Sequence, residues 1–285
     1  MTTTVPCNVP LPTDATARAS RLVLPREHGA WAMLLLPFVS ALLLARRLTW
    51  EVLPAAVVVV GLFVIREPQV ALWRQARVWK ERRAEAEQAR RSLVWYVPPI
   101  LVSGLLLLWR LPFWILLAMG MATALLTLAS VYLAVENRRR SLLLQLASAA
   151  GLSGSALMAW LAARANWGAA IWWLWGLQFA HSSGALLAVH TRLQTRIASR
   201  NGGESAGVKL SATAAQVLLL LGAAGCAATG RLGIALALAF SAGVHVADLA
   251  RLRDPAFLQT PLRRVGWREL GISVVFSALL LAGLW

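Results

Sequence analysis

Alternating loop charge is the feature of this sequence that most restricts its fold. Nine hydrophobic stretches are separated by polar segments, and 23 of the 28 Lys and Arg residues fall in every second segment, beginning with the N-terminal tail. Because the cytoplasmic loops of membrane proteins retain Lys and Arg, this pattern predicts a cytoplasmic N-terminus and an outside C-terminus. The stretches cover residues 30–45, 50–65, 93–109, 111–135, 141–163, 167–190, 211–229, 232–249 and 269–285.

The composition supports the same class of protein. Hydrophobic residues make up 59% of the chain and charged residues only 14%. Most stretches have about the ~20 apolar residues that cross a ~30 Å hydrocarbon core. We therefore predict an all-α polytopic membrane protein with nine transmembrane helices in one bundle. Its domains would be a disordered cytoplasmic tail over residues 1–24 and a single membrane domain over residues 25–285.

The net charge of +16 has two interpretations. In a soluble protein it would indicate a nucleic-acid partner. Here the basic residues follow the predicted topology instead of forming one patch, so no nucleic-acid partner is expected. The predicted partners are membrane lipids, because a basic cytoplasmic rim attracts anionic headgroups. Protein partners stay unknown at this stage.

Polar side chains at membrane depth are the candidate functional residues, because they are costly to keep there. Most of them lie at the predicted cytoplasmic ends of the helices, which favours a cavity facing the cytoplasm. An alternative is that they are ordinary interfacial caps and snorkelling side chains. The candidate ligand-binding residues are Glu27, His28, Arg66, Glu67, Glu136, Asn137, His181, Arg192 and Asp248.

Helical spacing relates some of these residues to each other. His181 and Arg192 are eleven residues apart, close to three turns, and so lie on one side of a helix. His245, Asp248 and Arg251 follow at three-residue spacing. Asp248 could orient the His245 ring, or it could form a structural ion pair at the helix end.

No catalytic residue can be assigned from motifs. The sequence contains no GxSxG, HExxH, GxxxxGK[ST] or CxxC pattern. Its two cysteines, Cys7 and Cys226, lack the spacing of a metal site, so no metal ligands are predicted. Whether the protein is an enzyme stays open.

The stretch PREHGAWAMLLLPF at residues 25–38 resembles the opening signature of the YwiC-like family of bacterial membrane proteins. The segments LRRVGWREL (262–270) and TRLQTR (191–196) are also similar to that family. The resemblance covers about residues 25–285. It implies a multi-pass protein of the bacterial cytoplasmic (inner) membrane, and it names a relative more than a function.

A more remote resemblance is to the UbiA-like intramembrane prenyltransferases, which also have nine helices with the same orientation. In that family Asp-rich motifs near the segments equivalent to 66–92 and 191–210 hold Mg²⁺ against a prenyl diphosphate. This sequence has Arg66-Glu67-Pro68-Gln69 near the first, and His181-Ser182-Ser183-Gly184 leading to Arg192 near the second. Neither is rich in oxygen ligands, so Mg²⁺ is disfavoured and no cofactor is predicted.

The resemblance together with the candidate residues implies a pocket rich in Arg and His that binds a lipid-like or isoprenoid anionic ligand. Arg can bind such a ligand directly, without a metal. The protein would then be a divergent, metal-poor relative of the prenyltransferases. Two other classes stay open, a small-molecule transporter or exporter and a non-catalytic membrane accessory protein.

The loop charges make the topology testable with reporter fusions. A reporter placed after Trp285 should report the outer side, and one inserted at 202–203 should report the cytoplasm. One reporter that is active only outside the membrane and another that is active only in the cytoplasm measure the two positions independently. Both fusions on one side of the membrane would rule out the nine-helix topology.

Overall fold

The computed structural model describes residues 22–25, 28–78, 81, 83–136, 142–201 and 206–285. Within these residues every regular element is helical and there is no strand. The long helices are α2 (His28–Ala45), α3 (Val52–Arg77), α4 (Ala84–Arg110), α5 (Phe113–Val135), α6 (Leu142–Ser153), α7 (Ser155–Arg164), α8 (Ala169–Asn201), α9 (Ala206–Ala228), α10 (Leu232–Ala250) and α12 (Leu262–Leu284). A 3₁₀ turn (Arg251–Arg253) and the short α11 (Pro255–Gln259) join α10 to α12.

Each hydrophobic stretch found in the sequence is largely helical in the described residues, so the all-α prediction is confirmed. Seven helices or helix pairs in the described part are long and apolar enough to cross a membrane, with α6 and α7 together forming one of them. The apolar part of α2 is shorter, at Gly29–Ala45. The count of nine crossings and the orientation of the termini stay predictions, and the predicted tail lies mostly outside the described residues.

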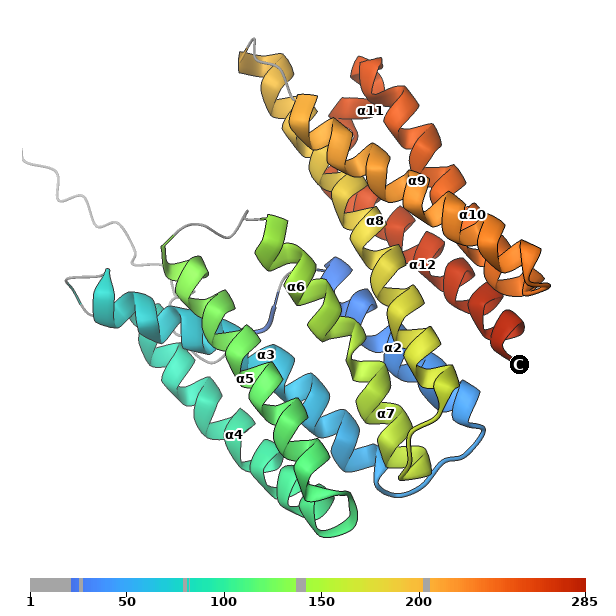
Figure 1. Cartoon of the computed structure of the whole chain (residues 1–285). Helices are drawn as coiled ribbons and strands as arrows, with labels where there is room; N and C mark the ends of the chain where they lie inside the picture. The colour runs from blue at the N-terminus through green and yellow to red at the C-terminus, as the bar shows by residue number, and fades with distance from the viewer. Residues whose placement is uncertain (1–21, 26–27, 79–80, 82, 137–141, 202–205) are drawn as a thin grey trace, which may run out of the picture.

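The helices form two groups with shared elements between them (Figure 1). On one side α3 packs against α4 and α5, and on the other α10 packs against α8, α9 and α12. Helices α2 and α7 link the groups, because α2 contacts α7, α8 and α12 while α7 also contacts α3. The main core cluster accordingly draws on α2, α7, α8, α9, α10 and α12.

Small residues let α7 lie close to its neighbours. Ala156, Ala159 and Ala163 of α7 are buried, and the Ser155 hydroxyl donates a hydrogen bond to the Leu34 carbonyl of α2 at 2.6 Å. In lipid no hydrophobic drive brings helices together, so close backbone approach and such bonds supply the packing energy. Gly154 separates α6 from α7 within the same predicted crossing.

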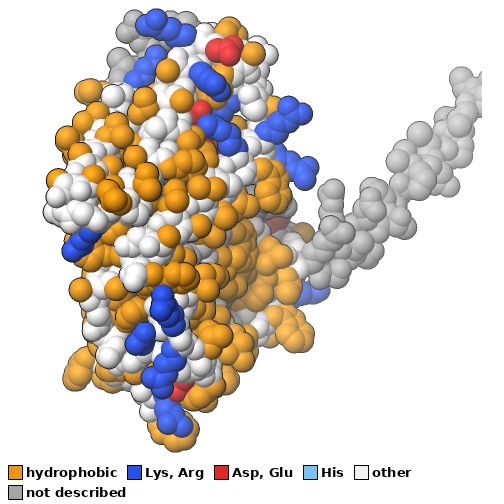
Figure 2. Space-filling model, turned by 90° about the vertical axis from the view of Figure 1, so that its right-hand side faces the viewer, with side chains coloured by type: hydrophobic (Ala, Val, Ile, Leu, Met, Phe, Trp, Pro, Cys, Tyr) orange, Lys and Arg blue, Asp and Glu red, His pale blue; other side chains and the backbone are white. Residues whose placement is uncertain are grey.

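The outer faces of the bundle are apolar. Large side chains stand exposed along α4 and α9, among them Trp95, Leu105, Leu218 and Leu221. Figure 2 shows hydrophobic side chains over the middle of one face, with Lys and Arg gathered towards its two ends. A continuous apolar surface of this extent suits lipid and not water.

Helices α10 and α12 approach each other closely at two glycines. A Cβ built on Gly233 would lie 2.4 Å from the Gly283 Cα, and one on Gly283 would lie 2.6 Å from the Gly233 carbonyl carbon. The obstructing atoms are backbone, so they cannot move aside as a flexible side chain would. The contact therefore requires glycine on both helices.

Gly233→Ala should destabilise the protein by about 1–3 kcal/mol, the usual cost of overpacking a filled interior. The matched control is Gly243→Ala on the same helix, where an added Cβ meets no atom within 4 Å. That change should be neutral or stabilise by up to about 1 kcal/mol, since alanine favours helix. Denaturant unfolding in detergent micelles measures both, and equal effects would contradict the close contact.

Candidate functional site

Helices α8, α10 and α12 bury polar side chains against each other. We call this set the polar seam, and its members are Gln178 and His181 of α8, Ser241 and His245 of α10, and Ser273 and Ser277 of α12. Ser273 and Ser277 are four residues apart and so share one face of α12, where Glu269 precedes them by one more turn. The side chains of Gln178 and Ser277 bond directly at 2.9 Å.

His181 is fully enclosed in the seam. Its Nδ1 lies 2.7 Å from the Ser241 hydroxyl, and its Nε2 lies 3.0 Å from the Ser273 hydroxyl. The ring stacks on Phe276 with the ring centres 4.1 Å apart. Both ring nitrogens already have partners, so a metal ion could bind His181 only by displacing one of the two serines.

His245 lies next to His181 in the seam and is also fully buried. Its Nδ1 is 2.7 Å from the Ser241 carbonyl oxygen, and its Nε2 is 3.1 Å from the Glu269 Oε2. Ser241 therefore bonds both histidines, one through its hydroxyl and one through its backbone. The two imidazole rings lie 6.3 Å apart.

An ion pair continues from the seam towards the end of the bundle. Arg268 of α12 bonds the Asp248 Oδ2, while the second oxygen, Oδ1, is buried without a hydrogen-bond partner. Arg192 of α8 donates to the Phe257 carbonyl of α11, and its guanidinium lies over the Phe257 ring at 3.9 Å. These contacts bring cationic and anionic groups from three helices to one place.

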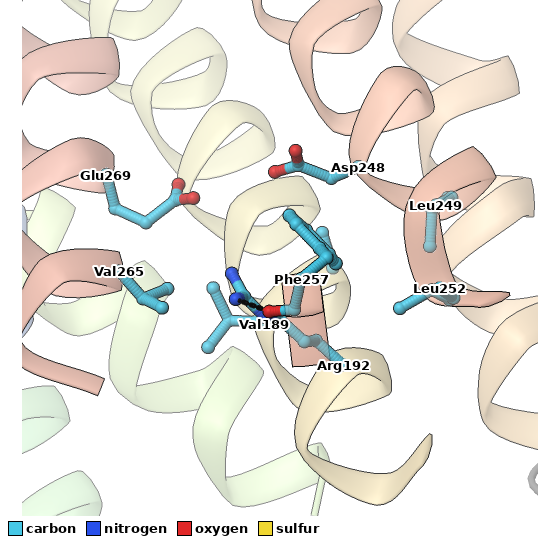
Figure 3. A pocket seen from close by; sticks show the side chains of 9 residues that line it. Val189, Arg192, Asp248, Leu249, Leu252, Phe257, Val265 and Glu269 are labelled. Carbon is cyan, nitrogen blue, oxygen red and sulfur yellow. Dashed lines mark hydrogen bonds between the residues drawn. The ribbon is translucent and has the colours of Figure 1, made fainter. Parts of the chain in front are cut away.

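Arg192 and Asp248 border a small, partly open pocket whose enclosed space is about 10 Å³, roughly the room for one water molecule. In Figure 3 the carboxylates of Asp248 and Glu269 lie on one side and the Arg192 guanidinium points to the Phe257 carbonyl. Most of the remaining wall is apolar. The lining residues are Ala188, Val189, Arg192, Asp248, Leu249, Leu252, Phe257, Val265 and Glu269.

The structure brings together three of the residues predicted from the sequence. Arg192 and Asp248 line the pocket, and His181 lies in the seam joined to it through Ser241 and His245. The predicted contact in which Asp248 orients the His245 ring is absent, because both side chains bond residues of α12 instead. The alternative, an ion pair formed by Asp248 at the helix end, is the arrangement found.

Other predicted residues lie elsewhere. The Arg66 Nε donates to the Ser130 hydroxyl of α5 at 2.6 Å, and Glu67 lies 3.9 Å from the Arg66 guanidinium. Glu136 follows the end of α5 and is exposed. Glu27, Asn137 and the His28 side chain lie outside the described residues. Arg66, Glu67 and Glu136 do not line the pocket.

Sequence reasoning did not select Glu269, Arg268 or His245 as site residues, although each is polar near a helix end. The signal available was their placement: Arg268 and Glu269 are consecutive and lie nearly two turns after the start of a helix. A single sequence does not reveal that α10 and α12 are neighbours. In the described part of the chain, no three His, Cys, Asp or Glu side chains gather as metal ligands do.

Comparison with known families gives one match. Residues 24–160, just under half of the chain, match the family model described as YwiC-like protein, which confirms the resemblance predicted from PREHGAWAMLLLPF over that range. No curated protein and no solved structure matches the chain. The matched residues include α2 to α6 and most of α7, and they end before the polar seam of α8, α10 and α12.

The Asp248–Arg268 pair should behave as a partly buried ion pair. Arg268→Met leaves the Asp248 carboxylate without its partner and should cost about 1–3 kcal/mol, less than a fully buried pair because Arg268 is 40% exposed. The double variant Asp248→Leu/Arg268→Met should cost less than Arg268→Met alone, since no unpaired charge remains. Arg264→Met, at an exposed position, is the control. Denaturant unfolding measures all four proteins, and a double variant at least as damaged as the single would refute the pairing.

Proposed function

From the premise that residues 24–160 belong to the YwiC-like family, we propose that this multi-pass membrane protein binds an anionic amphiphile in the pocket. The ligand class is a lipid or isoprenoid with an anionic head. The proposal includes nine crossings in a UbiA-like arrangement, a cytoplasmic N-terminus, and residence in the bacterial cytoplasmic membrane. It involves no metal ion.

The observation that carries the proposal is the joint presence of Arg192 and an apolar wall in the pocket. A guanidinium has five N–H donors, and Arg192 uses one of them on the Phe257 carbonyl. Arg268 likewise has donors beyond the one that bonds Asp248. Both arginines therefore keep capacity for an incoming phosphate or carboxylate, which guanidinium groups bind in a two-point contact.

The rest of the pocket favours an amphiphile over a small hydrophilic anion. Val189, Leu249, Leu252 and Val265 supply aliphatic surface beside the charged groups. An acyl or isoprenoid chain would bury this surface, and each CH₂ transferred from water is worth about 0.8 kcal/mol. The same chain would reach the pocket from the lipid around the bundle, without crossing water.

A second candidate function is transport of a small molecule. The polar seam favours it, because Gln178 and Ser277 continue the row of polar groups into the bundle beyond the pocket. Against it, the layer that follows them along the three helices is apolar, with Leu174, Leu238 and Leu281 all buried. An accessory role without a ligand is the third class, and in that case the polar seam would serve helix packing alone.

Arg192→Gln should weaken binding of geranyl phosphate and of phosphatidylglycerol by about tenfold, the value of one charge-assisted hydrogen bond. Native mass spectrometry of the detergent-purified protein counts bound molecules as the ligand is titrated. Arg263→Gln is the matched control, since Arg263 is exposed on α12 and does not line the pocket. Equal binding by both variants would place the ligand elsewhere and favour the accessory role.

A further inference from the structure

We propose that one end of the bundle binds anionic phospholipids of the membrane through arginines that lie over tryptophan rings. This end consists of the α2–α3, α4–α5, α7–α8 and α9–α10 connections together with the end of α12, along the lower and right-hand edge of Figure 1. The pocket lies towards the other ends of α10 and α12. The inference therefore goes beyond the proposed function and does not depend on it.

Four of the five arginines at this end lie over a tryptophan ring, and all five are exposed. A ring face attracts a guanidinium group because it carries partial negative charge. The arrangement recurs at four separate places in the chain, so it is a property of this whole end of the bundle. We call the four contacts the Arg–Trp collar; with the distances from guanidinium carbon to ring centre, they are Arg46–Trp285 at 4.8 Å, Arg110–Trp109 at 5.0 Å, Arg164–Trp160 at 5.5 Å and Arg231–Trp173 at 4.9 Å.

Basic residues are scarce at this end, and those present are not neutralised by carboxylates. The end holds five of the 28 Lys and Arg residues, the fifth being Arg47. Among its described residues Glu51 is the single carboxylate, and it takes part in none of their ion pairs. Near the other end of α10, by contrast, Arg268 pairs with Asp248. The charges of the collar are therefore available to anions from outside the chain.

The N–H donors of the collar also keep capacity for an anion. A ring face supplies no acceptor oxygen, and the Arg46 side chain has no hydrogen-bond partner among the described residues. Arg164 uses its Nε on the Ala45 carbonyl oxygen at 3.0 Å and keeps its remaining N–H donors. That bond places the Arg164 guanidinium beside the residue that precedes Arg46, so α2 and α7 bring two cations to one part of the collar. Phosphate oxygens accept from guanidinium groups in two-point contacts.

The position of the collar favours a lipid headgroup as the anion. The collar borders the apolar outer faces of the helices, and Trp109 and Trp285 are 77% and 65% exposed. An indole ring is largely apolar but carries one N–H group, so it suits the level at which hydrocarbon meets headgroups. Long arginine side chains at that level reach the lipid phosphates. A phospholipid with net negative charge should bind better than a zwitterionic one, whose own ammonium group the collar repels.

The test is native mass spectrometry of the full-length protein in detergent, titrated with phosphatidylglycerol or with phosphatidylcholine of the same acyl chains. The protein should retain at least about twice as many molecules of phosphatidylglycerol, since each arginine at a membrane surface favours an anionic lipid by about fivefold. This comparison needs no variant. Equal retention of the two lipids would overturn the proposal.

Arg46→Gln/Arg110→Gln/Arg231→Gln removes three of the four cations of the collar. The number of retained phosphatidylglycerol molecules should fall to about half or less of the parent value. Arg164 is left in place because it bonds the α2 backbone. The matched control is Arg47→Gln/Arg263→Gln/Arg264→Gln, which loses three charges at exposed arginines outside the collar and should keep most of the bound lipid. Equal losses in the two proteins would show attraction by net charge alone and would contradict the collar.

Trp173→Leu/Trp285→Leu tests the rings while every charge stays in place. Both rings are exposed, so this protein should fold normally, as measured by far-UV circular dichroism. Retention of phosphatidylglycerol should fall by about a third, because Arg46 and Arg231 are no longer held over a ring, and the corresponding Phe variant should recover part of the loss. Unchanged retention in the folded Leu variant would refute the role of the rings. Binding in the pocket contributes equally to all these proteins, so failure of the proposed function would leave the result intact.

Discussion

The absence of water inside a membrane is the constraint on which this structure depends. A buried polar group there must find its partner within the protein, at a cost of several kcal/mol if it fails. The polar seam satisfies this demand across three helices: Gln178 with Ser277, His181 with Ser241 and Ser273, and His245 with Glu269. The pairing fixes the rotation of α8, α10 and α12 about their axes, which pure hydrocarbon packing would leave loosely defined.

The same three helices therefore carry both specificity of packing and the candidate site. The seam ends at the pocket, where partly exposed charges replace fully buried neutral groups. Apolar residues close it in the other direction. The seam is thus fully buried along most of its length, and partly exposed charged groups lie at one end of it.

Much of the architecture could be predicted from the sequence because apolar length and loop charge are local signals. Each hydrophobic stretch became helix for that reason. The partners of His245 and Asp248 could not be predicted, since they depend on which helices lie side by side. Three-residue spacing suggested that His245 and Asp248 contact each other, but both project towards α12. There Glu269 bonds His245, and Arg268 bonds Asp248. Arg66 illustrates the same limit, since its partner Ser130 is 64 residues away.

The contact between Gly233 and Gly283 has a mechanical consequence for α12. At this end the two backbones touch without intervening side chains, so the helices have no room to slide. About 15 residues away, or roughly 22 Å along the helix, Arg268 and Glu269 hold α12 through bonds that can exchange partners. Helix α12 is therefore held rigidly at one end and by exchangeable side-chain bonds at the other. Any displacement of α12 at the pocket therefore turns about the glycine contact, and it is largest where the ligand would bind.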